Sequence, residues 1–330
     1  MDFDLTEDQQ EIKRVARDLL GARSTMAQVR SAADSRRYDD ALWQEIVGLG
    51  WTGIAVDERH GGQGLGAVEL AVLLEELGYA CAATPFLSTA VVASVLQSAG
   101  TDRQRERWLP GLVSGEVRAG VGPRELVLDG SEADIVLLIT GDSAVLLESF
   151  DSEPLQTIDP TRRCARVRGD GELLGSDAAA RFAVAVASEV IGVCQRALEM
   201  TVDYVKERKQ FGVPVGSFQA VSHRCAQMLL HTESARSAGY FAAWTADADP
   251  ERLPEGAALA AAAAATGGRE VTASAIQNHG GIGFTWEADV HWLYKRAELD
   301  RALLSGSSRH HAALARIAAQ RLAAAASAPA

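Results

Sequence analysis

A break between two helical segments constrains this chain more than any other feature. Apolar residues recur three and four positions apart over residues 183–205 and again over residues 218–229, which predicts two amphipathic helices. Gly212 can adopt the left-handed conformation of a helix C-cap, and Pro214 cannot continue a helix. We therefore expect one helix to end at Gly212 and the next to begin at an N-cap Ser217, with a turn between them.

The turn between these helices carries Arg208, and its guanidinium has two interpretations. It suits a diphosphate, because it is always charged and its donors can reach two oxygens at once. It also suits a solvated helix end, where the macrodipole favours a cation. A second stretch, AIQNHGGIGFTW at residues 275–286, ends another apolar helix in a Gly-Gly-x-Gly turn where the backbone can approach a ligand. This second turn favours the ligand interpretation.

The two stretches together resemble the acyl-CoA dehydrogenase family. The matching motifs are RKQFG at residues 208–212 with a following Gln219 and His223, and QNHGGIGF at residues 277–284. The segments MDFDLTEDQQ, LGWTGIAVDERHGGQGLGAVELAVLLEELGYA and PGLVSGE are also similar to the family's pattern. The resemblance implies an FAD-dependent oxidoreductase acting on a CH–CH bond of an acyl-CoA. It further implies that the adenosine diphosphate half of FAD is held across a subunit interface by Arg208, Gln210, Phe211, Gln219, Gln277, Gly280 and Gly281.

The family's catalytic base is missing from its usual positions. That base is a Glu that removes the α-proton of the thioester while the flavin takes a hydride. Its common position falls on Leu304, or on Ser305 after a one-residue shift, and its alternative position falls on Phe182. The family also has an Arg near the start of the long helix that carries Phe182 and precedes RKQFG. Its only candidate here, Arg181, stands two residues from the expected place. We therefore expect no catalytic residue of the family's kind in this chain.

Other titratable side chains near the motifs have ordinary explanations. Acids on an amphipathic helix usually form a solvated face, so we expect no catalytic role for the four acids that follow the second motif: Glu287, Asp289, Glu298 and Asp300. The histidines show no metal-ligand spacing; they include His223, His231, His279, His291, His310 and His311.

Composition excludes several classes of protein. The chain has 330 residues, of which 47% are hydrophobic, enough for two or three packed units. Its net charge is −12 and it has no basic run, which argues against a nucleic-acid partner. The acidic start at residues 1–4 is unlike a signal peptide, and we expect no membrane span. The cysteines at positions 81, 164, 194 and 225 lack redox or metal spacing, which predicts buried, reduced thiols in a cytoplasmic protein.

Periodicity predicts a mainly α chain with three parts. Residues 1–115 are helical, with Thr6 as an N-cap, and their GGQGLG turn at residues 61–66 lacks the spacing of a dinucleotide-binding loop. Residues 116–175 alternate as in a small antiparallel β domain. This part is shorter than the family's middle β domain and lacks its flavin-lining segments, which resemble TEPxxGSD and WITN. Residues 176–330 are expected to form a four-helix bundle, with the Ala-rich residues 257–265 in its core.

The surviving diphosphate motifs and the lost base together predict half of a flavin site. This pattern resembles the short subunits of actinobacterial α2β2 acyl-CoA dehydrogenases that act on CoA thioesters of cholesterol side chains. The resemblance implies that a longer chain of the same family supplies the catalytic Glu. Two alternatives stay open: a homo-oligomeric dehydrogenase with an unidentified base, and a structural subunit without flavin contact.

Overall fold

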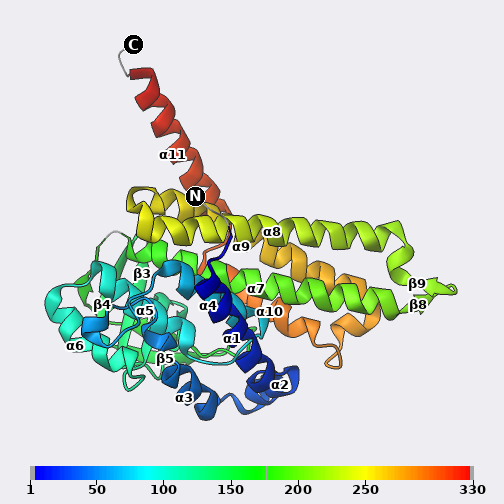
Figure 1. Ribbon diagram of the computed structural model, residues 1–330, viewed down its shortest axis with the longest axis horizontal. Helices are drawn as coiled ribbons and strands as arrows, with labels where there is room; N and C mark the ends of the chain where they lie inside the picture. Colours follow the sequence, from blue (N-terminus) through cyan, green and yellow to red (C-terminus); the bar gives the residue numbers. More distant parts are fainter. Residues whose placement is uncertain (1–3, 176, 328–330) are drawn as a thin grey trace.

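The computed structural model describes residues 4–175 and 177–327 (Figure 1). Its first part is helical, as predicted, and Thr6 forms a capping box with Gln9 at the first helix. The elements of this part are α1 (Glu7–Arg23), α2 (Met26–Ser35), α3 (Asp40–Gly48), η1 (Trp51–Gly53), η2 (Glu58–His60), α4 (Ala67–Tyr79), α5 (Phe86–Ala99) and α6 (Asp102–Val113).

A seven-stranded sheet follows, in the order β5-β6-β2-β1-β3-β4-β7. Its strands are β1 (Ala119–Pro123), β2 (Val127–Leu128), β3 (Ile135–Thr140), β4 (Ser143–Leu147), β5 (Asp151–Leu155), β6 (Cys164–Arg168) and β7 (Glu172–Leu173). The expectation of a purely antiparallel unit is wrong, because β1 pairs in parallel with β3. After β1 the chain reverses into the short β2 and then reverses again. Strand β3 therefore lies on the other side of β1 and runs in the same direction as β1. Strand β5 is polar and contains Pro154, which suits its place at the edge of the sheet.

The last part is again helical. Its elements are α7 (Ala178–Glu207), α8 (Gln219–Ala248), η4 (Pro250–Arg252), α9 (Leu253–His279), η5 (Gly280–Phe284), α10 (Val290–Leu303) and α11 (Ser308–Ser327). Helices α7 to α10 pack on one another, and the Ala-rich run lies largely in their core. Figure 1 shows the long helices extending beyond the sheet while α11 projects away from the body. The predicted fold class is confirmed, although Ser176, where the last part was expected to begin, lies outside the described residues.

Helix α7 differs from the expectation of no membrane-spanning run. By length and composition it is the helix, among those described, that could cross a membrane. However, 78% of its most apolar window is buried inside the protein, so its apolar face is used for packing.

The connection between α7 and α8 corrects both expected caps. Helix α7 ends at Glu207, and a two-stranded hairpin follows, formed by β8 (Lys209–Gln210) and β9 (Val213–Pro214). Gly212 is therefore not a helix C-cap. It shares a two-residue hairpin turn with Phe211, where both have positive φ values of 83° and 55°, as type I′ turns require. Ser217 is not the N-cap either, because the short helix η3 (Val215–Ser217) intervenes and Phe218 takes that position.

Helices α4 and α7 meet backbone to backbone through two glycines. A Cβ added at Gly192 of α7 would lie 1.8 Å from the carbonyl oxygen of Glu75 in α4. A Cβ added at Gly78 of α4 would lie 2.0 Å from the carbonyl oxygen of Glu189 in α7. Since real Cβ atoms do not approach this closely, the packing of α4 against α7 requires glycine at both positions.

We predict that Gly192→Ala lowers the free energy of unfolding by about 1–3 kcal/mol or more, because the backbones must separate. Gly21→Ala is the matched control, since Gly21 is exposed in α1 and its added Cβ meets no atom within 4 Å. The control should leave stability unchanged or raise it by up to about 1 kcal/mol. Denaturant unfolding of both variants checks this, and a Gly192→Ala protein as stable as the wild type would contradict the close packing.

Candidate functional site

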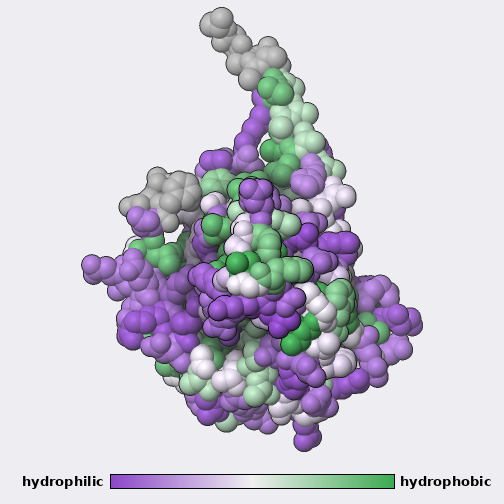
Figure 2. Space-filling model, turned by 90° about the vertical axis from the view of Figure 1, so that its right-hand side faces the viewer, coloured by the Kyte–Doolittle hydropathy of each residue, from purple (hydrophilic) through white to green (hydrophobic). Residues whose placement is uncertain are grey.

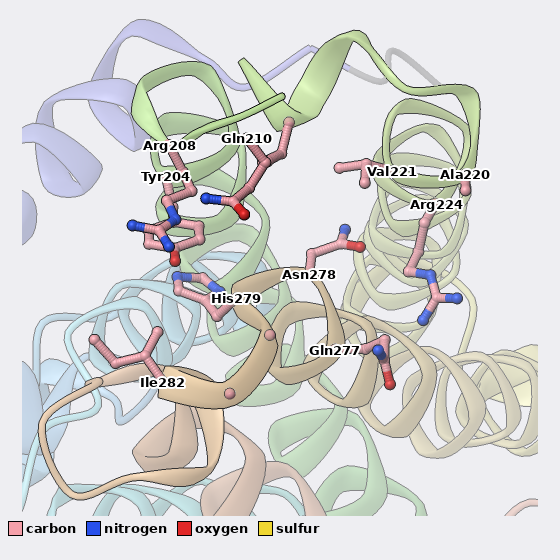
Figure 3. Close-up of a pocket in the computed structure, with 13 residues that line it drawn as sticks. Tyr204, Arg208, Gln210, Ala220, Val221, Arg224, Gln277, Asn278, His279 and Ile282 are labelled. Carbon is pink, nitrogen blue, oxygen red and sulfur yellow. The ribbon is translucent and has the colours of Figure 1, made fainter. Parts of the chain in front are cut away.

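A cleft of about 630 Å³ opens at the end of the helical bundle. Its walls come from the end of α7, the start of α8 and the last turn of α9 (Figure 3). The residues that line it are Tyr204, Arg208, Gln210, Val215, Ala220, Val221, Arg224, Gln277, Asn278, His279, Gly280, Gly281 and Ile282. The cleft thus joins the two sequence motifs, which are about seventy residues apart in the chain.

Five of the seven residues predicted to bind the cofactor line this cleft: Arg208, Gln210, Gln277, Gly280 and Gly281. Phe211 and Gln219 do not line it. Phe211 is 93% exposed in the hairpin turn and packs edge-on against Phe218, with ring centroids 6.3 Å apart. Gln219 is exposed at the first position of α8.

Charge in the cleft is positive and uncompensated. The lining contributes two guanidiniums, from Arg208 and Arg224, and none of the lining residues is an Asp or Glu. Neither arginine forms an ion pair within the described part of the chain. In a protein of net charge −12, two arginines facing one cleft without a carboxylate indicate an anionic ligand.

Gly280 and Gly281 form a turn at the floor of the cleft. The backbone conformation requires glycine at the first of these positions but not at the second. Gly280 has φ 65° and ψ −143°, a conformation that only glycine adopts readily. Gly281 has no such backbone requirement, and a Cβ added there meets no protein atom within 4 Å. The absence of a side chain at Gly281 therefore keeps the cleft open for a ligand to approach the backbone.

An aromatic pair supports the cleft beside Arg208. The rings of Tyr204 and His279 stack with centroids 4.4 Å apart and an interplanar angle of 20°. His279 Nδ1 lies 2.8 Å from the carbonyl oxygen of Ala275, to which it donates in the neutral ring. Burial lowers the pKa of His279, so the ring is neutral at pH 7 and adds no third positive charge.

Sequence reasoning missed Tyr204, Arg224, Asn278 and His279 as cleft residues. The missing signal for Arg224 was helical spacing, because Ala220, Val221 and Arg224 lie three and four positions apart on one face of α8. A lone arginine on a helix otherwise has no distinguishing pattern.

Two of the three positions where a base was sought are buried and apolar. Leu304 is 3% exposed and Phe182 is 2% exposed. Ser305 has a left-handed φ of 60° in the turn that follows α10. Arg181 bonds Asp177 and the carbonyl oxygen of Ala246. These positions offer no carboxylate to a substrate.

Asp300 corrects the expectation of a solvated acidic face. It is 1% exposed and lies beside a buried group of charges formed by Arg296, Asp159, Glu189 and Arg162. Arg296 Nε donates to Asp159 Oδ2 at 2.6 Å and its Nη1 donates to Glu189 Oε1 at 2.9 Å, while Arg162 also bonds Glu189. These two arginines and two carboxylates balance in charge. Burial and the nearby Glu189 carboxylate raise the pKa of Asp300 well above its usual range.

The other three acids are not catalytic candidates on this geometry. Glu298 is partly buried and pairs with Arg301 at 3.0 Å, which also departs from the expected solvated face. Asp289 pairs with Arg30 at 2.9 Å and Glu287 is exposed.

The predicted burial of the thiols is confirmed for three of the four cysteines. Cys81, Cys164 and Cys194 are buried, and burial raises the pKa of each to about 12. Cys225 is only partly buried, and its side chain accepts a hydrogen bond from Asn278 beside the cleft.

Comparison with known proteins shows the family of this chain. The family profiles "Acyl-CoA dehydrogenase, N-terminal domain" and "Acyl-CoA dehydrogenase, C-terminal domain" match residues 6–116 and 176–324. Acyl-CoA dehydrogenase IpdE2 of Mycobacterium tuberculosis is 35% identical over 305 residues, which cover 90% of this chain and 93% of that protein. The chain belongs to the acyl-CoA dehydrogenase family. The resemblance seen in the sequence is thereby confirmed.

Several solved structures share the fold. The steroid ACAD Tcur3481-Tcur3483, a G363A variant, superposes with a TM-score of 0.88 at 28% identity, over 96% of this chain and 99% of that one. The ChsE4-ChsE5 complex from Mycobacterium tuberculosis superposes with a TM-score of 0.84 at 25% identity over all of both chains. PigA, solved as an FAD complex, has a TM-score of 0.82 at 20% identity over 97% of this chain and all of its own, which shows likeness of fold alone.

We predict that Asp300→Asn makes the protein more stable than the wild type at neutral and alkaline pH. A carboxyl whose pKa is raised on folding contributes stability below its unfolded pKa of about 3.9, and this stability is lost as pH rises toward the folded pKa. The variant removes that loss, so its advantage should grow with pH by up to about 1.4 kcal/mol per unit. Denaturant unfolding between pH 5 and 8 tests this. A wild-type advantage that grows with pH would show that Asp300 is ionised in the fold.

Proposed function

We propose that this chain is the cofactor-holding, non-catalytic subunit of a heteromeric acyl-CoA dehydrogenase. Its cleft binds the adenosine diphosphate part of FAD, and a longer partner chain of the same family supplies the flavin-ring pocket and the catalytic Glu. The observation that carries this proposal is the cleft, where Arg208 has no protein counter-charge, set against the buried apolar side chains at the family's base positions.

The cleft residues fit an adenosine diphosphate. Arg208 offers a planar fork of donors for two phosphate oxygens. Gln210 stands beside it, and Gly281 lets phosphate oxygens come close to the backbone. FAD, when bound, supplies the hydride acceptor for the reaction, whereas these residues only bind and orient its adenosine end.

The interior of this chain does not fit a substrate reaction. The cavity between α4, α5, α7 and α8 measures only 20 Å³, enough for about one water molecule. Asp300, the acid nearest to the family's base position in sequence, is sealed among buried charges. Among the described residues, the family's base positions therefore offer a homo-oligomer no carboxylate for proton abstraction.

The cleft end of the bundle fits a partner chain. Large apolar side chains are exposed around it: Phe211 at 93%, Phe284 at 81% and Trp286 at 66%. Figure 2 looks onto this end of the molecule and shows hydrophobic side chains among hydrophilic ones. Exposed aromatic side chains grouped in this way are typical of protein–protein contacts.

The similar proteins support a proposed partner and substrate class. ChsE4-ChsE5 is a complex of two differently named chains, and Tcur3481-Tcur3483 is a steroid ACAD. We propose the same arrangement here, as an α2β2 assembly that acts on the CoA thioester of a steroid side chain. In this assembly each FAD lies between one copy of this chain and one copy of the partner.

We predict that Arg208→Ala lowers the affinity of the co-expressed assembly for FAD by about 10–100-fold, on the order of 1.5–3 kcal/mol for a charge-assisted contact. Arg208→Lys should restore only part of it, because the ammonium lacks the fork. Arg103→Ala is the control, since Arg103 is exposed on α6, away from the cleft. The measurement is flavin per assembly after dialysis, by absorbance. Unchanged flavin in both Arg208 variants would support a structural subunit instead.

A second prediction concerns Leu304, where the family's base would stand. In an assembly whose partner Glu has been replaced by Gln, Leu304→Glu should restore no turnover, because position 304 is buried and faces no substrate cavity. The new carboxylate should also lower stability by several kcal/mol, whereas the control Leu304→Met should not. Turnover per FAD and the unfolding midpoint are measured together. Restored turnover would mean that this chain contains its own substrate site.

A further inference from the structure

Arg224 lines the cleft but belongs to neither of the two sequence motifs that the cleft joins. It projects from the second turn of α8, across the cleft from Arg208 (Figure 3). Its guanidinium forms no ion pair with any residue that the structure describes. A diphosphate bound at Arg208 and Gly281 therefore leaves Arg224 unexplained.

The two walls of the cleft differ in chemistry. The Arg208 wall includes Gln210 and the open glycine turn, which suit phosphate oxygens. The other wall carries Arg224 and Gln277, together with the small apolar side chains of Ala220 and Val221 (Figure 3). A ligand that uses both walls must be anionic at one end and flat, with hydrogen-bonding edges, at the other.

Adenine matches the second wall. A guanidinium stacks on the face of an aromatic ring, and a carboxamide pairs with the N6 and N7 edge of adenine through one acceptor and one donor. The apolar side chains of Val221 and Ala220 can cover the remaining ring surface. All three contacts are within the lining of one cleft.

We infer that Arg224 is a specificity-determining residue that recognises the adenine end of the cofactor, an inference that rests on the proposed function. Arg208 recognises the diphosphate, and a flavin mononucleotide also carries one phosphate. Arg224 recognises the base, which only the dinucleotide carries. The cleft therefore selects a flavin dinucleotide through two separate contacts.

The test uses the co-expressed assembly after removal of flavin, with ADP and inorganic diphosphate as probes in calorimetric titrations. Arg224→Ala should weaken ADP about tenfold and leave diphosphate affinity unchanged. Arg208→Ala should weaken both probes, and Arg103→Ala should weaken neither. Arg224→Lys should recover part of the ADP affinity, because it keeps a cation but loses the planar face.

Four results would overturn the inference. A loss of diphosphate affinity in Arg224→Ala would make Arg224 a phosphate contact. Tighter binding of 3′-phospho-ADP than of ADP, lost in Arg224→Ala, would make it a contact for the ribose phosphate of a CoA. If Arg208→Ala weakens ADP and Arg224→Ala does not, this inference fails and the proposed function stands. If neither variant changes ADP binding, both fail.

Discussion

The buried guanidinium of Arg296 is the contact on which the arrangement of the three parts depends. It comes from α10, and it bonds Asp159 next to the sheet, Glu189 of α7 and the carbonyl oxygen of Ala82 between α4 and α5. The Arg296 side chain is 0% exposed, so removing one of its charged partners would lower the free energy of unfolding by several kcal/mol. The N-terminal helices, the sheet and the bundle must therefore meet in one geometry for this charge to be compensated. That geometry fixes the rotation of α7 and hence the place of its far end.

The same interior explains why the candidate site is at the end of the bundle. The centre of the molecule is occupied by balanced charges and by glycine-mediated contact of α4 with α7. Leu304 and Phe182 pack there as core residues. Free guanidiniums, open glycines and exposed aromatic rings instead gather where α7 and α9 end and α8 begins. In the proposed assembly, this end of the chain would present one side of the flavin site.

The sequence predicted the helical class, the three parts and five of the thirteen cleft residues, because local motifs and periodicity carry that information. It failed where the answer depends on distant parts of the chain. Gly212 has the same preference for positive φ in a helix cap and in a hairpin turn, so only the structure distinguishes them. Asp300 has the spacing of a surface acid, and its burial arises from Glu189 and Arg296 packing around it. Arg224 has no distinguishing pattern in the sequence, and only the structure shows that it faces Arg208 across the cleft.

The central claim is that this chain supplies one side of a shared flavin site and no complete site of its own. The most direct measurement is the number of FAD molecules per co-expressed assembly, with subunit stoichiometry from native mass spectrometry and flavin from absorbance. We predict two FAD for two copies of each chain, and little FAD on this chain purified alone. Four FAD per four chains, or full flavin occupancy of this chain by itself, would contradict it.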